Sequence, residues 1–383
     1  MAARVPMSKS VVHCVRLRPE SVLVDYERLA HFSGLGAGFD PHATTILREE
    51  RSLPFPLPGA NSPPWQVEGA AVSLRAAGFE NLARAHGRDP RELETDTRTR
   101  RAARVITERH GLRTLHTRDA SVERFVEYRP RAQLRVLHET LPDGLYVPKS
   151  FFGTNVVHLP VARPPHPRRL WGSLGSTLLG LFGAASEEAL AAGPHAFVDA
   201  LAVEREVHAG SFTFVDATTV VPERHGVLQE PLTTNLAFAG RDPVAVDATI
   251  ARLYGYDPLQ CAALVLAQDA GLGVADPRDI TLTGDPLPSA PWVAHDDTEA
   301  PMADRLRERL ASAVHMRRTG GPLARAVASL DASYERRLLW RLRGERMFEH
   351  WRDRSPWGKL DEAYASGTHE RVTGRPSVAP ILR

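Results

Sequence analysis

The sequence predicts an α/β protein with an open, mostly parallel sheet flanked by helices and a helical C-terminal appendage. Apolar runs of strand length alternate with helical stretches over residues 11–285, which is typical of a doubly wound sheet. Past Pro286 apolar residues recur at helical spacing among arginines. Hydrophobic residues make up 43% of the chain, enough for a sizeable core. We therefore expect an α/β domain over residues 1–290 and a helical appendage with a C-terminal arm over residues 291–383.

The first half of the chain alternates between the two element types. Ser21 is expected to cap a helix that runs through Phe32, and a second helix should run from Trp65 to Ala77, ended by Gly78. The charged residues 89–109 predict a helix with a solvated face. The glycine-containing apolar stretch from Leu170 is too short to span a bilayer, so we predict a buried or lid helix there. Strands are predicted at residues 11–17, 44–48, 112–117, 134–140 and 155–162.

The most informative stretch, residues 212–284, follows a predicted helix over residues 194–207. One strand ends at Asp216, and the next leads into a helix opened by Asp242. A last strand ends at Gly284. The apolar periodicity over residues 300–366 predicts C-terminal helices that pack on the sheet domain or on a partner subunit, including a homo-oligomer.

Composition excludes several classes of function. A net charge of +2 gives no overall attraction to nucleic acid, and only Lys9, Lys149 and Lys359 could carry covalent lysine chemistry. Cys14 and Cys261 are too few for an iron–sulfur cluster within this chain, and they fit a reducing cytoplasm. No signal-peptide core or membrane-spanning run is present, so we expect no membrane partner. The excess of arginine over lysine, with abundant alanine, proline and glycine, is typical of a bacterial high-GC genome.

The order of the motifs resembles domain-of-unknown-function family 362, most clearly over residues 155–285. Upstream, Arg48 stands at a lysine position of the family, and Pro160 and His166 lie where the family has a proline–lysine–lysine–histidine signature whose lysines are missing here. The resemblance implies an α/β fold and a site location, in a divergent member without the ferredoxin-like cysteine clusters of many relatives. The matching elements are Asp216, Asp242 through Asp247, Gly255, Gly271-Leu272-Gly273 and Gly284.

Two aspartates are the main candidates for catalysis, because ligands of parallel sheets bind outside the carboxyl ends of the strands. Asp216 lies at the end of an apolar strand, and Asp247 is the only acid inside an otherwise apolar helix. If they converge, they could hold a divalent metal ion or divide into an acid and a base. A structural role is the alternative for each, and for Asp247 this is a link to a loop backbone or an arginine.

Further candidates surround these acids. Asp242 is placed to cap its helix by accepting from Val244 or Ala245, or else to bind substrate. Arg48 and Lys149 could orient negative charge on a substrate. The loop residues His166 and His225 could join Asp216 in proton transfer or in binding a transition metal. His158 lies in a predicted strand, and we expect it to be a core histidine.

The leading functional hypothesis is a cytoplasmic bacterial enzyme that acts on a small anionic metabolite by acid/base or metal-assisted chemistry, within specialised metabolite biosynthesis. The alternative is a non-catalytic accessory protein that docks a redox or metallo-enzyme partner through its C-terminal helices. A third, weaker hypothesis is a protein that sequesters a metabolite without turnover. No GxSxG elbow, Walker loop or dinucleotide fingerprint occurs to support the corresponding enzyme classes.

Overall fold

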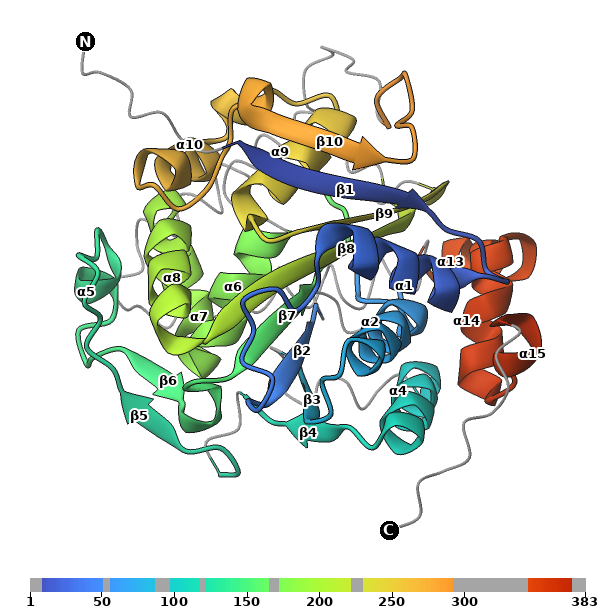
Figure 1. Ribbon diagram of the computed structural model, residues 1–383, viewed down its shortest axis with the longest axis horizontal. Helices are drawn as coiled ribbons and strands as arrows, with labels where there is room; N and C mark the ends of the chain where they lie inside the picture. Colours follow the sequence, from blue (N-terminus) through green and yellow to red (C-terminus); the bar gives the residue numbers. More distant parts are fainter. Residues whose placement is uncertain are drawn as a thin grey trace.

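An eight-stranded sheet runs through the centre of the protein, with helices on both of its faces (Figure 1). The computed structural model describes residues 9–50, 56–86, 97–117, 121–164, 172–221, 230–292 and 344–373. Among the helices of these ranges, none combines the length and apolar character that crossing a membrane requires.

The strand order is β10-β1-β9-β8-β7-β2-β3-β4. Strand β9 is antiparallel to both of its neighbours, β1 and β8, and all other pairs are parallel, so the predicted mostly parallel sheet is confirmed. A separate antiparallel pair joins β5 (Phe125–Glu127) to β6 (Tyr146–Pro148). The strands of the main sheet are β1 (Ser10–Arg16), β2 (Thr45–Glu49), β3 (Leu82–His86), β4 (Arg113–Leu115), β7 (Asn155–Leu159), β8 (Gly210–Val220), β9 (Leu232–Gly240) and β10 (Ile280–Gly284).

The helices divide between the two faces according to the alternation of side chains along the strands. Phe212 and Phe214 of β8 share a core cluster with Tyr26, whereas the next residue, Val215, packs on the opposite face with Ala245. The first face carries α1 (Val22–Ser33), α2 (Pro64–Ala76) and α4 (Thr97–His110). The second carries α6 (Ser173–Leu181), α7 (Ser186–Ala191), α8 (Pro194–Val207), α9 (Pro243–Leu253) and α10 (Ala262–Asp269).

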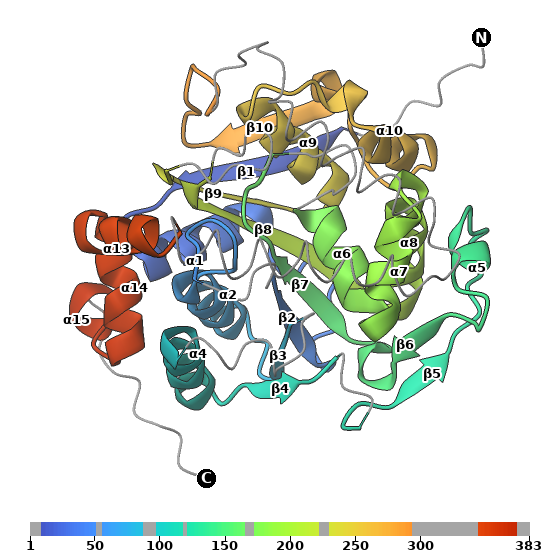
Figure 2. The ribbon, with the colours of Figure 1, turned by 180° about the vertical axis from the view of Figure 1, so that it is seen from behind.

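The C-terminal helices α13 (Glu345–Arg354), α14 (Pro356–Ser366) and α15 (Glu370–Thr373) lie beside α1, α2 and α4, as Figure 2 also shows. Trp357 is fully buried, with its ring centroid 5.1 Å from that of Trp65. Its Nε1 donates to the side chain of Asn235, 2.7 Å away. The described part of the appendage therefore shares one core with the sheet. The periodic residues 300–343 lie outside the described ranges.

Most predicted elements are present, but one is wrong. Residues 134–140, predicted as a strand, instead contain a loop and the short helix α5 (Leu137–Thr140). The carboxylate of Asp199 accepts the backbone N–H groups of Arg135, Val136 and Leu137, so these groups are turned toward one side chain rather than toward a neighbouring strand. The apolar alternation of this segment could not reveal a partner 62 residues away.

Short elements and caps show smaller differences. Strand β3, with the sequence LARAH, gives no strong β signal and was not expected. Ser21 precedes α1 as predicted, but its side chain makes no capping bond. Its hydroxyl instead donates to Asp25, at 2.7 Å.

Candidate functional site

A pocket opens at the carboxyl edge of the sheet, on the face of α2 and α4. The sheet changes direction between β2 and β7, because the chain leaves β2 through α2 on one face and leaves β7 through α6 to α8 on the other. Ligands of open α/β sheets bind at such switch points. The pocket is lined by the loop before α2, by Val161 just past β7, by Asp216 of β8, and by α4 and α13. Its volume is about 70 Å³.

Asp216 is the buried carboxylate of this pocket. Its Oδ2 accepts hydrogen bonds from the Tyr26 hydroxyl and from Trp65 Nε1, each at 2.9 Å. Its Oδ1 accepts from the backbone N–H and the hydroxyl of Thr218, at 3.0 and 2.7 Å. Burial raises the pKa of Asp216, and these hydrogen bonds offset only part of that rise. Four neutral donors thus surround the carboxylate, and no cation of the described residues pairs with it.

The two arginines that line the pocket are each held by a carboxylate. Arg84 of β3 contacts Glu49 of β2 at 2.5 Å, and both side chains are buried. Arg98 of α4 pairs with Glu362 of α14, and its guanidinium lies 5.8 Å from the ring centre of Phe348. Their positive charge is therefore matched before any ligand enters. The aromatic walls of the pocket are Trp65, Phe348 and Trp351.

Asp247 holds the start of another helix. Its two carboxylate oxygens accept the backbone N–H groups of Ser173 and Leu174, at 2.8 and 3.0 Å. The residue at the N-cap of α6 is Gly172, with φ +93°, and a Cβ there would lie 2.6 Å from Asp247 Oδ1. Burial raises the pKa of Asp247 to about 7, against the two N–H bonds, and the charge of Glu50 adds to the rise. Asp247 thus supplies the cap that glycine lacks, the backbone link that was one of its expected alternatives.

The expectation that Asp216 and Asp247 converge is wrong. Asp216 is bonded to Tyr26 and Trp65 on the α1 and α2 face, and Asp247 is bonded to α6 on the opposite face. A single ion or substrate cannot be shared across the sheet. No group of three or more His, Cys, Asp or Glu side chains in the described ranges could hold a metal ion.

Asp242 links the start of α9 to strand β1 and to the loop at Val274 by hydrogen bonds. Its Oδ1 accepts the N–H groups of Val244 and Ala245, at 3.0 and 3.1 Å, which confirms the predicted cap of α9. Its Oδ2 accepts from the Ser10 hydroxyl at 2.5 Å and from Val274 N–H at 2.9 Å. A Cβ on Gly273 would lie only 2.3 Å from Asp242 Oδ1, so the GLG segment is glycine where the loop meets this carboxylate. Two elements of the family-like motif therefore meet as a structural unit, away from the pocket.

Arg48 is sealed in the core of the second face. Its Nη1 lies 3.4 Å from Glu204 of α8, and its guanidinium lies 4.7 Å from the ring centre of Phe151. His158 also contacts Glu204, at 3.0 Å, and contacts Ser176 at 3.1 Å, so the expected core histidine is confirmed. Burial raises the pKa of Glu204, but His158 and Arg48 outweigh it and hold the pKa at about 2.

The remaining predicted site residues do not reach the pocket in the described structure. Lys149 is exposed in the short turn η1 (Lys149–Phe151), just before β7 begins and therefore at the amino edge of the sheet. His166 and His225 lie outside the described residues.

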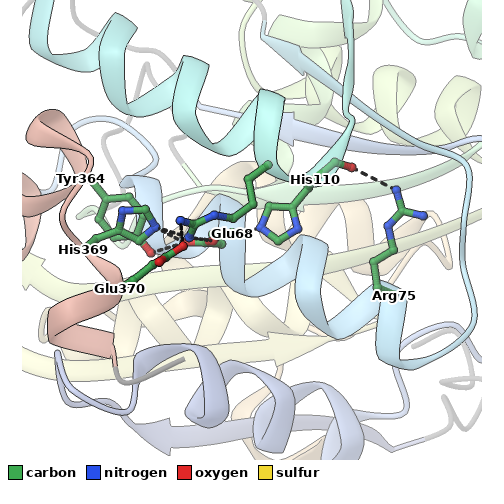
Figure 3. Close-up of polar contacts among 7 residues, drawn as sticks. Glu68, Arg75, His110, Tyr364, His369 and Glu370 are labelled. Atoms are coloured by element: carbon green, nitrogen blue, oxygen red, sulfur yellow. Dashed lines mark hydrogen bonds and ion pairs between the residues drawn. The ribbon is translucent and has the colours of Figure 1, made fainter. Parts of the chain in front are cut away.

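A buried ionic cluster between α2, α4 and the C-terminal helices was missed from the sequence (Figure 3). Four donors converge on the carboxylate of Glu68. Burial raises the pKa of Glu68, but these contacts outweigh it and place the pKa well below its usual value. Arg109 also pairs with Glu370. The donors to Glu68 are Arg109 Nη1 at 3.0 Å, His110 Nε2 at 3.0 Å, the Tyr364 hydroxyl at 2.6 Å and His369 Nε2 at 3.3 Å.

This cluster matters for the pocket because it fixes α14, which together with α13 forms one pocket wall. Glu68 and His369 give no local sequence signal, because they contact each other across a separation of 301 residues. No family model matches the chain, and no curated protein matches it.

Proposed function

We propose that the protein is an enzyme that acts on a small metabolite bound in the pocket at Asp216, using acid/base chemistry. The observation that carries this proposal is a buried carboxylate, held by four donors, in the lining of a pocket beside the switch point of the sheet. Perturbed carboxyl groups in clefts of this kind are candidate catalytic groups.

Thr218 connects the carboxylate to the pocket. It lines the pocket, and its hydroxyl donates to Asp216 Oδ1 at 2.7 Å. The four donors fill the lone pairs of Asp216. A substrate proton would therefore pass to the Thr218 oxygen while the Thr218 proton moves to Asp216, and the reverse transfer would make the pair an acid. General acid/base groups of this kind contribute rate factors on the order of 100 to 10,000.

An anionic substrate was expected because Arg48 and Lys149 could orient its charge. Arg48 is instead buried in an ion pair, and Lys149 lies at the other edge of the sheet, so neither residue supports that expectation. The relationship to domain-of-unknown-function family 362, the bacterial and cytoplasmic setting and a role in specialised metabolism belong to the same proposal, and they rest on the sequence patterns alone.

The accessory hypothesis receives less support. The apolar side chains of α13 and α14 are used inside the protein, where Phe348, Trp351, Trp357, Leu360 and Tyr364 join the core cluster of the first face. These helices therefore do not present that face to a redox or metallo-enzyme partner.

The test begins with small molecules that co-purify with the protein or raise its melting temperature, identified by mass spectrometry. Each is incubated with the protein, and its conversion is followed by the same method. We expect Thr218→Val to bind the substrate but to lose about 100-fold or more in turnover, and Asp216→Asn to lose at least as much turnover. The matched control is Thr219→Val, which makes the same change in a pocket residue that does not contact Asp216. Equal turnover in the Thr218→Val and Thr219→Val proteins would contradict the proposed role of the pair.

A further inference from the structure

The charge balance of the pocket points to the kind of molecule it accepts, and this inference rests on the proposed function of the same site. Asp216 is 2% exposed, and each of its oxygens faces a group that can only donate, Trp65 Nε1–H at Oδ2 and the Thr218 backbone N–H at Oδ1, so the site accommodates the ionised carboxylate. A buried charge without a counterion is costly. No cation of the described residues provides one.

The arginines of the pocket do not change this balance. Arg84 is neutralised by Glu49, and Arg98 is neutralised by Glu362. The five side chains Arg84, Arg98, Glu49, Glu362 and Asp216 comprise two cations and three anions, a formal charge of −1.

The walls suit an organic cation rather than a hydrated metal ion. Trp65, Phe348 and Trp351 line the pocket, and aromatic faces attract organic ammonium groups. The guanidinium of Arg98 near the ring of Phe348 shows that this wall already accommodates a cation. The cavity volume of about 70 Å³ suits a small molecule.

We infer that the pocket binds the ammonium group of a small amine or quaternary ammonium compound, with the carboxylate of Asp216 as its counterion and Trp65 and Trp351 as its aromatic walls. The ligand is thus a cation, and the anionic substrate suggested by Arg48 and Lys149 is replaced.

Three probes of one shape test this inference by calorimetric titration of the full-length protein. They are choline, its neutral carbon analogue 3,3-dimethylbutan-1-ol, and the anion 3,3-dimethylbutanoate. We expect choline to bind about tenfold or more tightly than the neutral analogue, and the anion to bind most weakly. The Asp216→Asn protein should bind choline and the alcohol equally. Asp247→Asn makes the same change in a buried acid on the opposite face and should keep the preference.

A second pair of variants covers the case in which Asp216→Asn fails to fold. Trp351→Leu removes a pocket wall, and Trp292→Leu removes an equally buried tryptophan from the core cluster of the other face. Only the first should weaken choline relative to the alcohol. Equal binding of the three probes, preference for the anion, or no binding of choline would overturn the inference. If Thr218→Val and Asp216→Asn abolish turnover of a molecule that is not a cation, the proposed function stands and only the inference about the ligand's charge fails. If they leave every binding and turnover unchanged, the proposed function fails as well.

Discussion

The hydroxyl of Tyr364 donates to the carboxylate of Glu68 across 2.6 Å, joining the last described helices to α2 over a separation of 296 residues. Both side chains are buried. This bond and its neighbours hold α14 against the sheet domain and, with it, one wall of the pocket. Stability and the shape of the pocket therefore depend on the same contact.

Replacing Glu68 with glutamine should destabilise the protein by about 3–5 kcal/mol near neutral pH, because its four donors, including the fully buried Tyr364 and His369, lose a charged acceptor. The folded-state pKa of Glu68 is lowered, so its contribution is full above the ordinary value of 4.5 and is lost as the pH falls below it. Urea unfolding between pH 7 and about pH 3 measures both effects. The control Glu80→Gln alters an exposed ion pair with Arg75 and should cost less than about 1 kcal/mol. A Glu68→Gln protein whose stability falls as steeply with acid as the parent's would contradict this assignment.

The opposite pH dependence is expected from Asp247. Burial raises its pKa to about 7 in the folded state, from an ordinary 3.8. A raised carboxyl pKa stabilises the folded protein most below the unfolded value, and that contribution is lost as the pH rises from about 4 to about 7. Denaturant titrations of the parent and of Asp247→Asn should show this decline only in the parent. The amide also places a donor against the N–H groups that start α6, which should cost about 1–2 kcal/mol at low pH. Parallel pH curves for the two proteins would show that Asp247 does not titrate there.

A methyl group added at Gly273 should disrupt the hydrogen bonds of Asp242. Gly273→Ala places a Cβ 2.3 Å from Asp242 Oδ1 and 2.6 Å from Val244, so we expect a loss of about 1–3 kcal/mol beyond any backbone strain. Gly271→Ala is the matched control, because it also has a positive φ but its Cβ would meet nothing within 4 Å. Thermal unfolding of the two variants compares them directly. If Gly271→Ala is as destabilising as Gly273→Ala, the loss comes from backbone conformation and not from the contact with Asp242.

Arg48 and Lys149 were expected to share a role, but they should respond very differently to mutation. Arg48→Met leaves Glu204 buried with only part of its countercharge, and we expect a loss of about 3–5 kcal/mol. Lys149→Ala removes an exposed side chain and should change stability by less than about 0.5 kcal/mol. The midpoint of urea unfolding measures both changes. Similar losses in the two variants would mean that Arg48 is not the buried ion-pair partner described above.

Local sequence was enough to predict the order of most strands and helices, because apolar periodicity and capping residues act over a few positions. Asp242 is an example, since the donors to its Oδ1 come from the next turn of its own helix. The α/β class followed from the same periodicity. Local sequence did not predict the short strand β3, because its residues have little β propensity. It did not predict the turn at residues 134–140 either, because that turn is organised by the distant Asp199.

Only the tertiary structure decided which candidates share a site. Asp216 and Asp247 both carry the chemistry expected of catalytic acids, but the alternation along β8 directs one toward α1 and α2, while α9 packs on the other face. The sequence contains no signal for this separation, because it depends on the face to which each connecting helix crosses. The pocket has the same origin: its walls at Trp65, Asp216 and Trp351 come from three distant segments, which only the packed core brings together.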